Sequence, residues 1–316
     1  MVSQRKPPTV VKALLCGRAP LGDERFVGTL RGWFETTLAG PAGSLWQRLI
    51  ARPVQPGDAT GWGGSPPSDV TGPPERYVGE PGETWAEYGF IPEGHEETVG
   101  VQPFTLAGWA DCLDNVGVAT GTAELSIFKL RRRAHFGAPG SPGVFVSAAV
   151  RTGGDGALWY RLTLRIPADR AETLLPVIRA AAQSGNPTYG EISYAARLRQ
   201  SAREVALNQD GEAGLLSSER FARGYSWLTV IAQHLGERLG GIEALRDSGA
   251  FTEVQALPDG GFWLLATDRI ADYGPDQAGR VFRALRPVLD LTKRPEAERY
   301  YEEPRLLASE DVGLPS

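Results

Sequence analysis

The chain has 316 residues, of which 41% are hydrophobic and 22% are charged, so it can bury a sizeable core and is not disordered throughout. It carries 33 Lys and Arg residues against 38 Asp and Glu residues, and the net charge of −5 speaks against bulk binding to nucleic acid or to an anionic membrane. No segment approaches the roughly 18 consecutive apolar residues that a membrane-spanning helix needs. We therefore expect a soluble, cytoplasmic protein.

The cysteines and the N-terminal residues bear on the compartment in which the chain folds. Cys16 and Cys112 are too few for a disulfide framework and do not form a C-x-x-C pair, which favours a reducing compartment. The apolar stretch that ends at Cys16 is short, is interrupted by Lys12 and is not followed by an A-x-A cleavage site. We predict that residues 10–16 form a buried strand.

The first half of the chain contains several helix signals. Asp23 is a good N-cap for a helix that Gly40 and Pro41 would end, and a second short helix is predicted over 44–51. A third helix is predicted over 103–116. Its expected inward residues are Phe104, Leu106, Trp109, Leu113 and Val116. A strand over 122–130 follows.

The second half combines hairpins with helices. Strands over 144–150 and 158–166 flank a Gly-Gly-Asp-Gly turn, and a second hairpin is predicted around 258–261. The remaining expected elements are helices over 169–182, 233–248 and 275–289, and strands over 189–195, 225–231, 251–257 and 262–266. The segment 201–224 is expected to be a connection.

This order of elements predicts an α+β fold with a mostly antiparallel sheet and helices packed on one side. The Gly- and Pro-rich stretch at 138–143 is the best candidate for a boundary. It would separate an N-terminal region, 1–140, from a C-terminal region, 141–291, followed by a loose tail, 292–316. One continuous domain remains an alternative, because strands on the two sides of the stretch could pair.

Residues 53–102 differ in character from the rest of the chain. They hold 8 Pro and 10 Gly, and nine acidic residues against the single basic residue Arg76, a local balance of −8. Such a segment cannot be regular throughout, although its aromatic residues favour partial order. An acidic insertion of this length is typical of a functional or a disordered loop.

The sequence offers few residues for catalysis or metal binding. His95 lies among the carboxylates of Glu93, Glu96 and Glu97 and could bind a divalent cation in a metal-assisted hydrolase, but an exposed acidic turn is the simpler interpretation. The other histidines, His135 and His234, make no metal-ligand spacing. No nucleophile elbow or phosphate-binding loop is present. We expect no cofactor, no metal and no catalytic residue.

A basic cluster formed by Lys129 and residues 131–133 is the one credible phosphate-binding patch. It leaves open a second alternative, a module that binds phosphate or nucleic acid. Consecutive charges at the end of a strand are more often solvated or paired with acids elsewhere in the chain, so nucleic acid is not the expected partner.

The most specific stretches of the sequence are 223–230, which reads Arg-Gly-Tyr-Ser-Trp-Leu-Thr-Val, the Leu-Gly-Gly at 239–241, and 257–264, which reads Leu-Pro-Asp-Gly-Gly-Phe-Trp-Leu. With the strand at 159–164, they resemble immunity proteins of bacterial polymorphic-toxin and type VI secretion systems over residues 143–291. The resemblance implies an antidote that binds and blocks a cognate toxin, and it implies no catalytic residues. Trp227 and Trp263 are expected to be core anchors.

The acidic, aromatic segment suits a protein that binds a basic partner, such as a nuclease-type toxin. A carboxylate-rich surface can occupy a basic active-site cleft as phosphate does, and charge attraction speeds capture. We therefore predict a partner-binding surface in this segment. Its expected contributors are Trp85, Glu87, Tyr88, Glu93, Glu96 and Glu97.

Overall fold

The structure is a computed structural model that describes residues 10–20, 23–51, 77–79, 82–94, 102–116, 118–130, 134–135, 142–195 and 218–289. The chain divides into two compact units. The central unit comprises Leu21–Ile166, and the C-terminal unit comprises Met1–Pro20 together with Pro167–Ser316. Each unit combines helices with an antiparallel sheet, so the chain is α+β as predicted.

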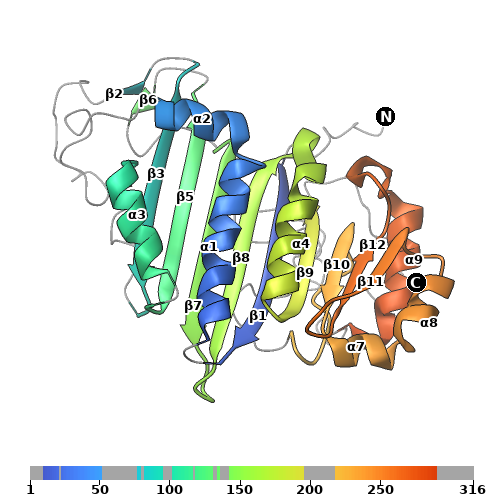
Figure 1. The fold of residues 1–316 in the computed structure, drawn as a ribbon. Helices are drawn as coiled ribbons and strands as arrows, with labels where there is room; N and C mark the ends of the chain where they lie inside the picture. The colour runs from blue at the N-terminus through green and yellow to red at the C-terminus, as the bar shows by residue number, and fades with distance from the viewer. Residues whose placement is uncertain are drawn as a thin grey trace. The chain divides into compact units, whose positions relative to one another are not determined.

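The described residues of the central unit form five strands in the order β8-β7-β5-β3-β4, all antiparallel, and a small β2–β6 pair (Figure 1). The strands are β2 (Tyr77–Gly79), β3 (Thr84–Pro92), β4 (Gln102–Pro103), β5 (Gly121–Lys129), β6 (Ala134–His135), β7 (Val144–Thr152) and β8 (Leu158–Pro167). The helices are α1 (Glu24–Ala39), α2 (Gly43–Ala51) and α3 (Leu106–Asn115).

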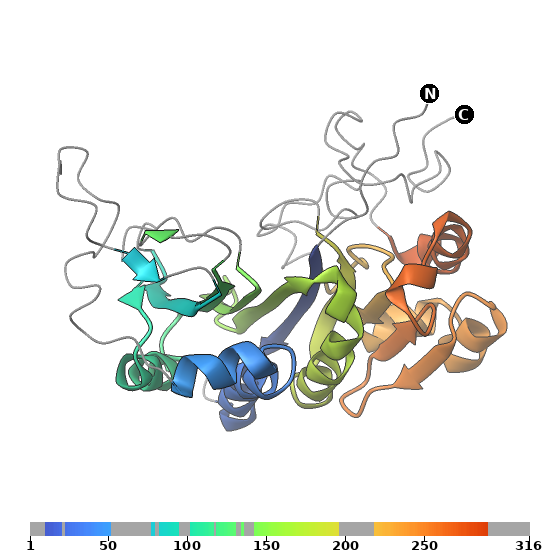
Figure 2. The ribbon, with the colours of Figure 1, turned by 90° about the horizontal axis from the view of Figure 1, so that it is seen from above.

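Local signals explain where these helices begin. The Asp23 carboxylate accepts a hydrogen bond from the Arg25 amide and caps α1, and the Thr105 hydroxyl accepts one from the Gly108 amide and caps α3. All three helices cover the same face of this unit's sheet (Figures 1 and 2). The other face of β3, β5, β7 and β8 carries no helix among the described residues, and we call it the helix-free face.

In the part of the C-terminal unit that the structure describes, five strands lie in the order β11-β12-β10-β9-β1, again antiparallel. The strands are β1 (Val10–Ala19), β9 (Pro187–Tyr194), β10 (Leu228–Ile231), β11 (Glu253–Ala256) and β12 (Phe262–Leu265). The helical segments among its described residues are η1 (Ala168–Thr173), α4 (Leu174–Ser184), α7 (Gln233–Arg238), α8 (Gly241–Asp247), η2 (Ile270–Asp272), α9 (Pro275–Leu285) and η3 (Arg286–Val288).

Helices lie on both sides of the sheet in the C-terminal unit. Helix α4 covers one face of β1 and β9, and α9 lies on the other side of the sheet (Figures 1 and 2). The ring of Phe282 in α9 packs against the ring of Tyr225. The next residue, Ser226, donates a hydrogen bond to Glu191 of β9, and this bond lies on the second face of the sheet. The expectation of helices on one side therefore holds for the central unit alone.

Most predicted elements are confirmed to within a few residues, including both hairpins and the helix that Asp23 caps. Three findings differ. The segment 53–102 contains β3, a nine-residue strand within the sheet. The helix expected over 233–248 is two helices, because Gly240 adopts a left-handed φ of 91° between them. The units divide after residues 20 and 166 rather than near 140, because β1 pairs with β9. The tail beyond 289 lies outside the described residues.

Within the described ranges, none of the helices has both the length and the apolar character needed to cross a bilayer.

Candidate partner-binding site

Strand β3 places two of the six predicted site residues on the helix-free face. Trp85 and Glu87 point to the same side of the strand, and the indole Nε1 donates a hydrogen bond to the Glu87 carboxylate at 3.2 Å. Trp85 is only 1% exposed, whereas Glu87 is half-buried. Glu87 can therefore contact a partner, and Trp85 mainly supports Glu87 from within the core.

Tyr88 lies on the opposite face of β3, beneath α3. Its ring packs edge-on against Phe104 and Trp109, and its hydroxyl donates to the Gln102 side chain at 3.4 Å. Burial raises the pKa of this phenol above its ordinary value. A Cβ atom on Gly108 would lie 1.8 Å from the Tyr88 hydroxyl oxygen, so a glycine is needed at this point of α3. Tyr88 joins α3 to the sheet and does not share a surface with Glu87.

Glu93 follows the end of β3 and is half-buried. Its amide donates to the Thr120 carbonyl at 3.1 Å, and its carboxylate accepts from the Thr152 amide at 3.3 Å. These bonds fix Glu93 beside the turn that precedes β5. Glu96 and Glu97 lie outside the described residues, so the structure brings together Trp85 and Glu87 but leaves the six-residue surface a prediction.

The helix-free face carries both signs of charge. Glu87 on β3 and Glu124 on β5 are half-buried carboxylates of this face, which the pairing register places on neighbouring strands. On β7 and β8 the charges are positive: Arg151 donates to Thr122 at 3.4 Å, and the Arg165 guanidinium lies 4.2 Å from the centre of the Phe145 ring. This face is therefore not uniformly acidic.

One of the residues that we predicted to face inward from α3 does not do so. Trp109 is 4% exposed and Val116 is 2% exposed, as predicted, but Leu106 is 50% exposed. The helix buries the stripe that contains Trp109 and Cys112, and Leu106 lies outside this stripe. An exposed leucine at the start of a helix that packs on β3 was not anticipated from the sequence.

Within the ranges that the structure covers, no group of three or more His, Cys, Asp or Glu side chains could hold a metal ion. His95 and residues 131–133 lie outside these ranges, as does the side chain of His135, while Lys129 is exposed. His234 is exposed on α7, where a ring nitrogen contacts the Glu219 carbonyl. The described residues therefore do not test the hydrolase and nucleic-acid alternatives.

Cys112 is buried on α3, and its Sγ donates to the Gly89 carbonyl at 3.6 Å. Burial, with a smaller effect from the Glu124 carboxylate, raises the pKa of its thiol from 9.0 to about 12. A thiol with this pKa carries almost no thiolate at neutral pH, so Cys112 is not a nucleophile.

The raised pKa predicts a loss of stability in alkali. Above about pH 9 the unfolded thiol releases its proton while the folded thiol keeps it, so the folded state binds more protons and its stability falls as the pH rises towards about 12. Tyr88 contributes in the same direction. The C112A variant should show a shallower fall in the free energy of unfolding, by up to about 1.4 kcal/mol per pH unit. Urea titrations from neutral pH to about pH 11 measure both slopes; equal slopes would contradict the assignment.

Sequence reasoning missed a buried carboxylate in the C-terminal unit. Glu191 on β9 is fully buried and accepts hydrogen bonds from the hydroxyls of Tyr189 at 2.9 Å, Ser193 at 3.4 Å and Ser226 at 2.8 Å. Lys12, only 2% exposed, lies on the same face, since β1 pairs it with Ser193. The available signal was a charged residue in a strand flanked by apolar residues. This network attaches the segment before β10 to β9.

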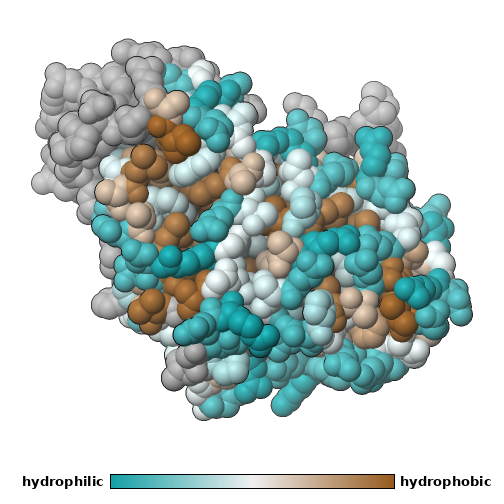
Figure 3. Space-filling view, in the orientation of Figure 1, coloured by the Kyte–Doolittle hydropathy of each residue, from teal (hydrophilic) through white to brown (hydrophobic). Residues whose placement is uncertain are grey.

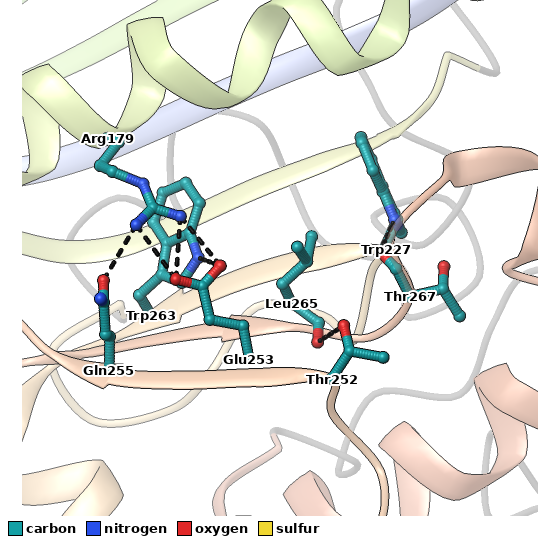
Figure 4. A network of polar contacts seen from close by, with 8 residues as sticks. All are labelled: Arg179, Trp227, Thr252, Glu253, Gln255, Trp263, Leu265 and Thr267. Atoms are coloured by element: carbon teal, nitrogen blue, oxygen red, sulfur yellow. Dashed lines mark hydrogen bonds and ion pairs between the residues drawn. The ribbon is translucent and has the colours of Figure 1, made fainter.

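A second polar network joins α4 to the hairpin β11–β12 (Figure 4). The Arg179 guanidinium donates to both carboxylate oxygens of Glu253 at 2.9 and 3.0 Å and to Gln255 at 3.0 Å. It also lies 4.4 Å from the centre of the Trp263 ring, whose Nε1 donates to Glu253 at 3.3 Å. The guanidinium is thus held by a bidentate ion pair and by an aromatic face.

This network should contribute measurably to stability. A double-mutant cycle with R179A and E253A should give a coupling of about 1 kcal/mol, because the pair is bidentate and each side chain is only 31% exposed. The more exposed pair Arg246–Glu243 is a control with an expected coupling of about 0.3 kcal/mol. Urea unfolding of the four proteins measures the coupling. Additive single effects would show that the contact is incidental.

No family model matches the chain, and no curated protein matches it. Among solved structures, the chain is similar to the Pseudomonas aeruginosa T6SS protein PA0821, with a TM-score of 0.51 and 10% sequence identity over 98% of this chain and 82% of that one. At this identity the likeness concerns the fold alone. The chain thus has a fold similar to that of a protein of a type VI secretion system.

Proposed function

We propose that this chain is an immunity protein of a bacterial type VI secretion or polymorphic-toxin system, and that it binds and blocks one toxin without catalysis. The observation that carries the proposal is the fold similarity to a T6SS protein, which agrees with the independent resemblance in sequence. The stretches behind that resemblance form β10, the junction of α7 and α8, and the hairpin β11–β12. These three belong to the C-terminal unit, whereas the fourth stretch, 159–164, lies in β8 of the central unit.

These stretches supply a scaffold rather than a contact surface. Trp227 and Trp263 are both fully buried, as expected for core anchors. The proposed contacts therefore lie elsewhere, and the half-buried carboxylates Glu87 and Glu93 are the predicted acidic contributors among the described residues. An acidic surface would speed the capture of a basic toxin.

An affinity capture from the native bacterial lysate tests this function. The bait is the full chain, and the control bait has Glu87, Glu93, Glu96 and Glu97 changed to Gln. We expect one stoichiometric partner that kills a bacterial host when expressed alone and is harmless when the chain is co-expressed. Recovery of that partner by both baits would contradict the role of the glutamates. Retention of only nucleic acid or metal, or a partner whose toxicity the chain does not relieve, would contradict the antidote function.

A further inference from the structure

Two large hydrophobic side chains are exposed in the part of the chain that the structure describes, and both border α3. Leu106, the first residue of the helix, is 50% exposed, and Val118, in the turn that follows it, is 79% exposed. Single exposed hydrophobic residues are common on protein surfaces. Here, however, they occur at the two ends of one ten-residue helix and nowhere else among the described residues.

Helix α3 has a second apolar stripe beside the one it buries. Leu106, Ala110 and Leu113 follow the i, i+4, i+7 spacing that places residues on one side of a helix. Leu106 and Ala110 are exposed and Leu113 is half-buried, while Trp109 and Cys112 face the sheet. Apolar side chains are accordingly visible over α3 in Figure 3. The stripe and Val118 together form what we call the α3 surface.

Carboxylates border the α3 surface. Asp111 and Asp114 are exposed on α3. Asp114 forms an ion pair with Arg31 of α1, with 2.8 Å between the Arg31 Nη2 and Asp114 Oδ1 atoms. Glu93, whose amide bonds to the Thr120 carbonyl, lies beside the turn that carries Val118. Two exposed carboxylates thus lie on the helix that carries the apolar strip, and a third lies beside the turn that follows it. A partner that combines an apolar anchor with basic neighbours would complement this pattern.

We infer that the α3 surface is a docking site for the toxin, which lays apolar side chains along the strip from Leu106 to Val118 and places lysine or arginine side chains against Asp111, Asp114 and Glu93. This inference rests on the proposed function. It shares Glu93 with the predicted acidic site, whereas Glu87 of that site lies on the helix-free face, and it adds apolar contacts to the acidic ones.

Photo-cross-linking in the native bacterium separates the two proposals. Benzoylphenylalanine is placed at position 106 or 118, and in controls at the exposed positions Gln183 on α4 and Asp247 on α8. We expect cross-links from 106 and 118 to one protein that is toxic without the chain. A toxic protein that cross-links only from the control positions would overturn the docking site and leave the antidote function standing. Cross-links to a non-toxic protein would overturn the antidote function, and no cross-link from 106 or 118 would overturn the docking site.

Affinity measurements give the expected size of the effect. The probe is the purified toxin recovered with the wild-type bait, titrated against the L106E/V118E double variant. Charges in the apolar strip should weaken binding by at least about 30-fold. The matched control A39E, at an exposed alanine of the same unit, should change the affinity less than about twofold. Unchanged melting temperatures would show that all variants fold, and equal affinity of the double variant and the control would overturn the docking site.

Discussion

Replacing Glu191 by alanine should lower the free energy of unfolding by about 3–5 kcal/mol. The carboxylate is fully buried, and three hydroxyl donors lose their acceptor when it is removed. The loss would also leave Lys12, which is buried on the same face, without this neighbouring negative charge. Urea unfolding followed by tryptophan fluorescence measures the change.

The conservative variant shows which property of Glu191 matters. E191Q keeps one acceptor oxygen and nearly the same volume, so hydrogen bonding alone predicts a loss of about 1–2 kcal/mol. A loss as large as that of E191A would assign the stabilisation to the negative charge. If E191A unfolds at the same urea concentration as the wild-type chain, the network does not hold the segment before β10 in place.

Replacing Trp227 by alanine should have a similarly large effect, with a loss of about 3–5 kcal/mol, because the side chain is fully buried. Its Nε1 also donates to the Thr267 carbonyl at 2.7 Å (Figure 4). W227F keeps most of the apolar volume and should lose about 1–2 kcal/mol, mainly through this hydrogen bond. Thermal and urea unfolding of both variants test this ranking.

Binding measurements on the W227F variant distinguish a structural role of Trp227 from a direct contact with the toxin. If Trp227 is a core anchor, W227F should bind the toxin with nearly wild-type affinity at a temperature where it is folded. A large loss of affinity in folded W227F would show instead that the strand β10 lies at the interface.

Local signals predicted much of the fold. The Asp23 cap, the Gly-Gly-Asp-Gly turn and the Pro-Asp-Gly-Gly turn act through neighbouring residues, and the elements they delimit are confirmed. The sequence did not predict strand β3, because the high Gly and Pro content of 53–102 indicates irregular structure. The nine residues of β3 form a strand because they pair with β5, which a local pattern does not reveal. The division into units depends on β1 pairing with β9, about 175 residues apart, which no local pattern encodes.

The candidate site was predictable only in part. Its acidic character follows from composition, and Glu87 and Glu93 are half-buried, so their role at a site stays a prediction. Periodicity alone could not show which stripe of α3 faces the sheet, because Trp109 and Leu106 both lie at helical spacing from further apolar residues. Packing against Tyr88 decides it. Glu191 was missed because its partner Ser226 lies 35 residues away.

The most direct test of the antidote function is a competition on a solid surface between the native bacterium and a derivative in which the chain can be depleted. We predict that the depleted derivative is killed by its parent and that plasmid-borne wild-type chain restores its survival. The competition is run under conditions in which the parent kills other competitors by type VI secretion. If the depleted derivative survives as well as its parent under these conditions, the antidote function is contradicted.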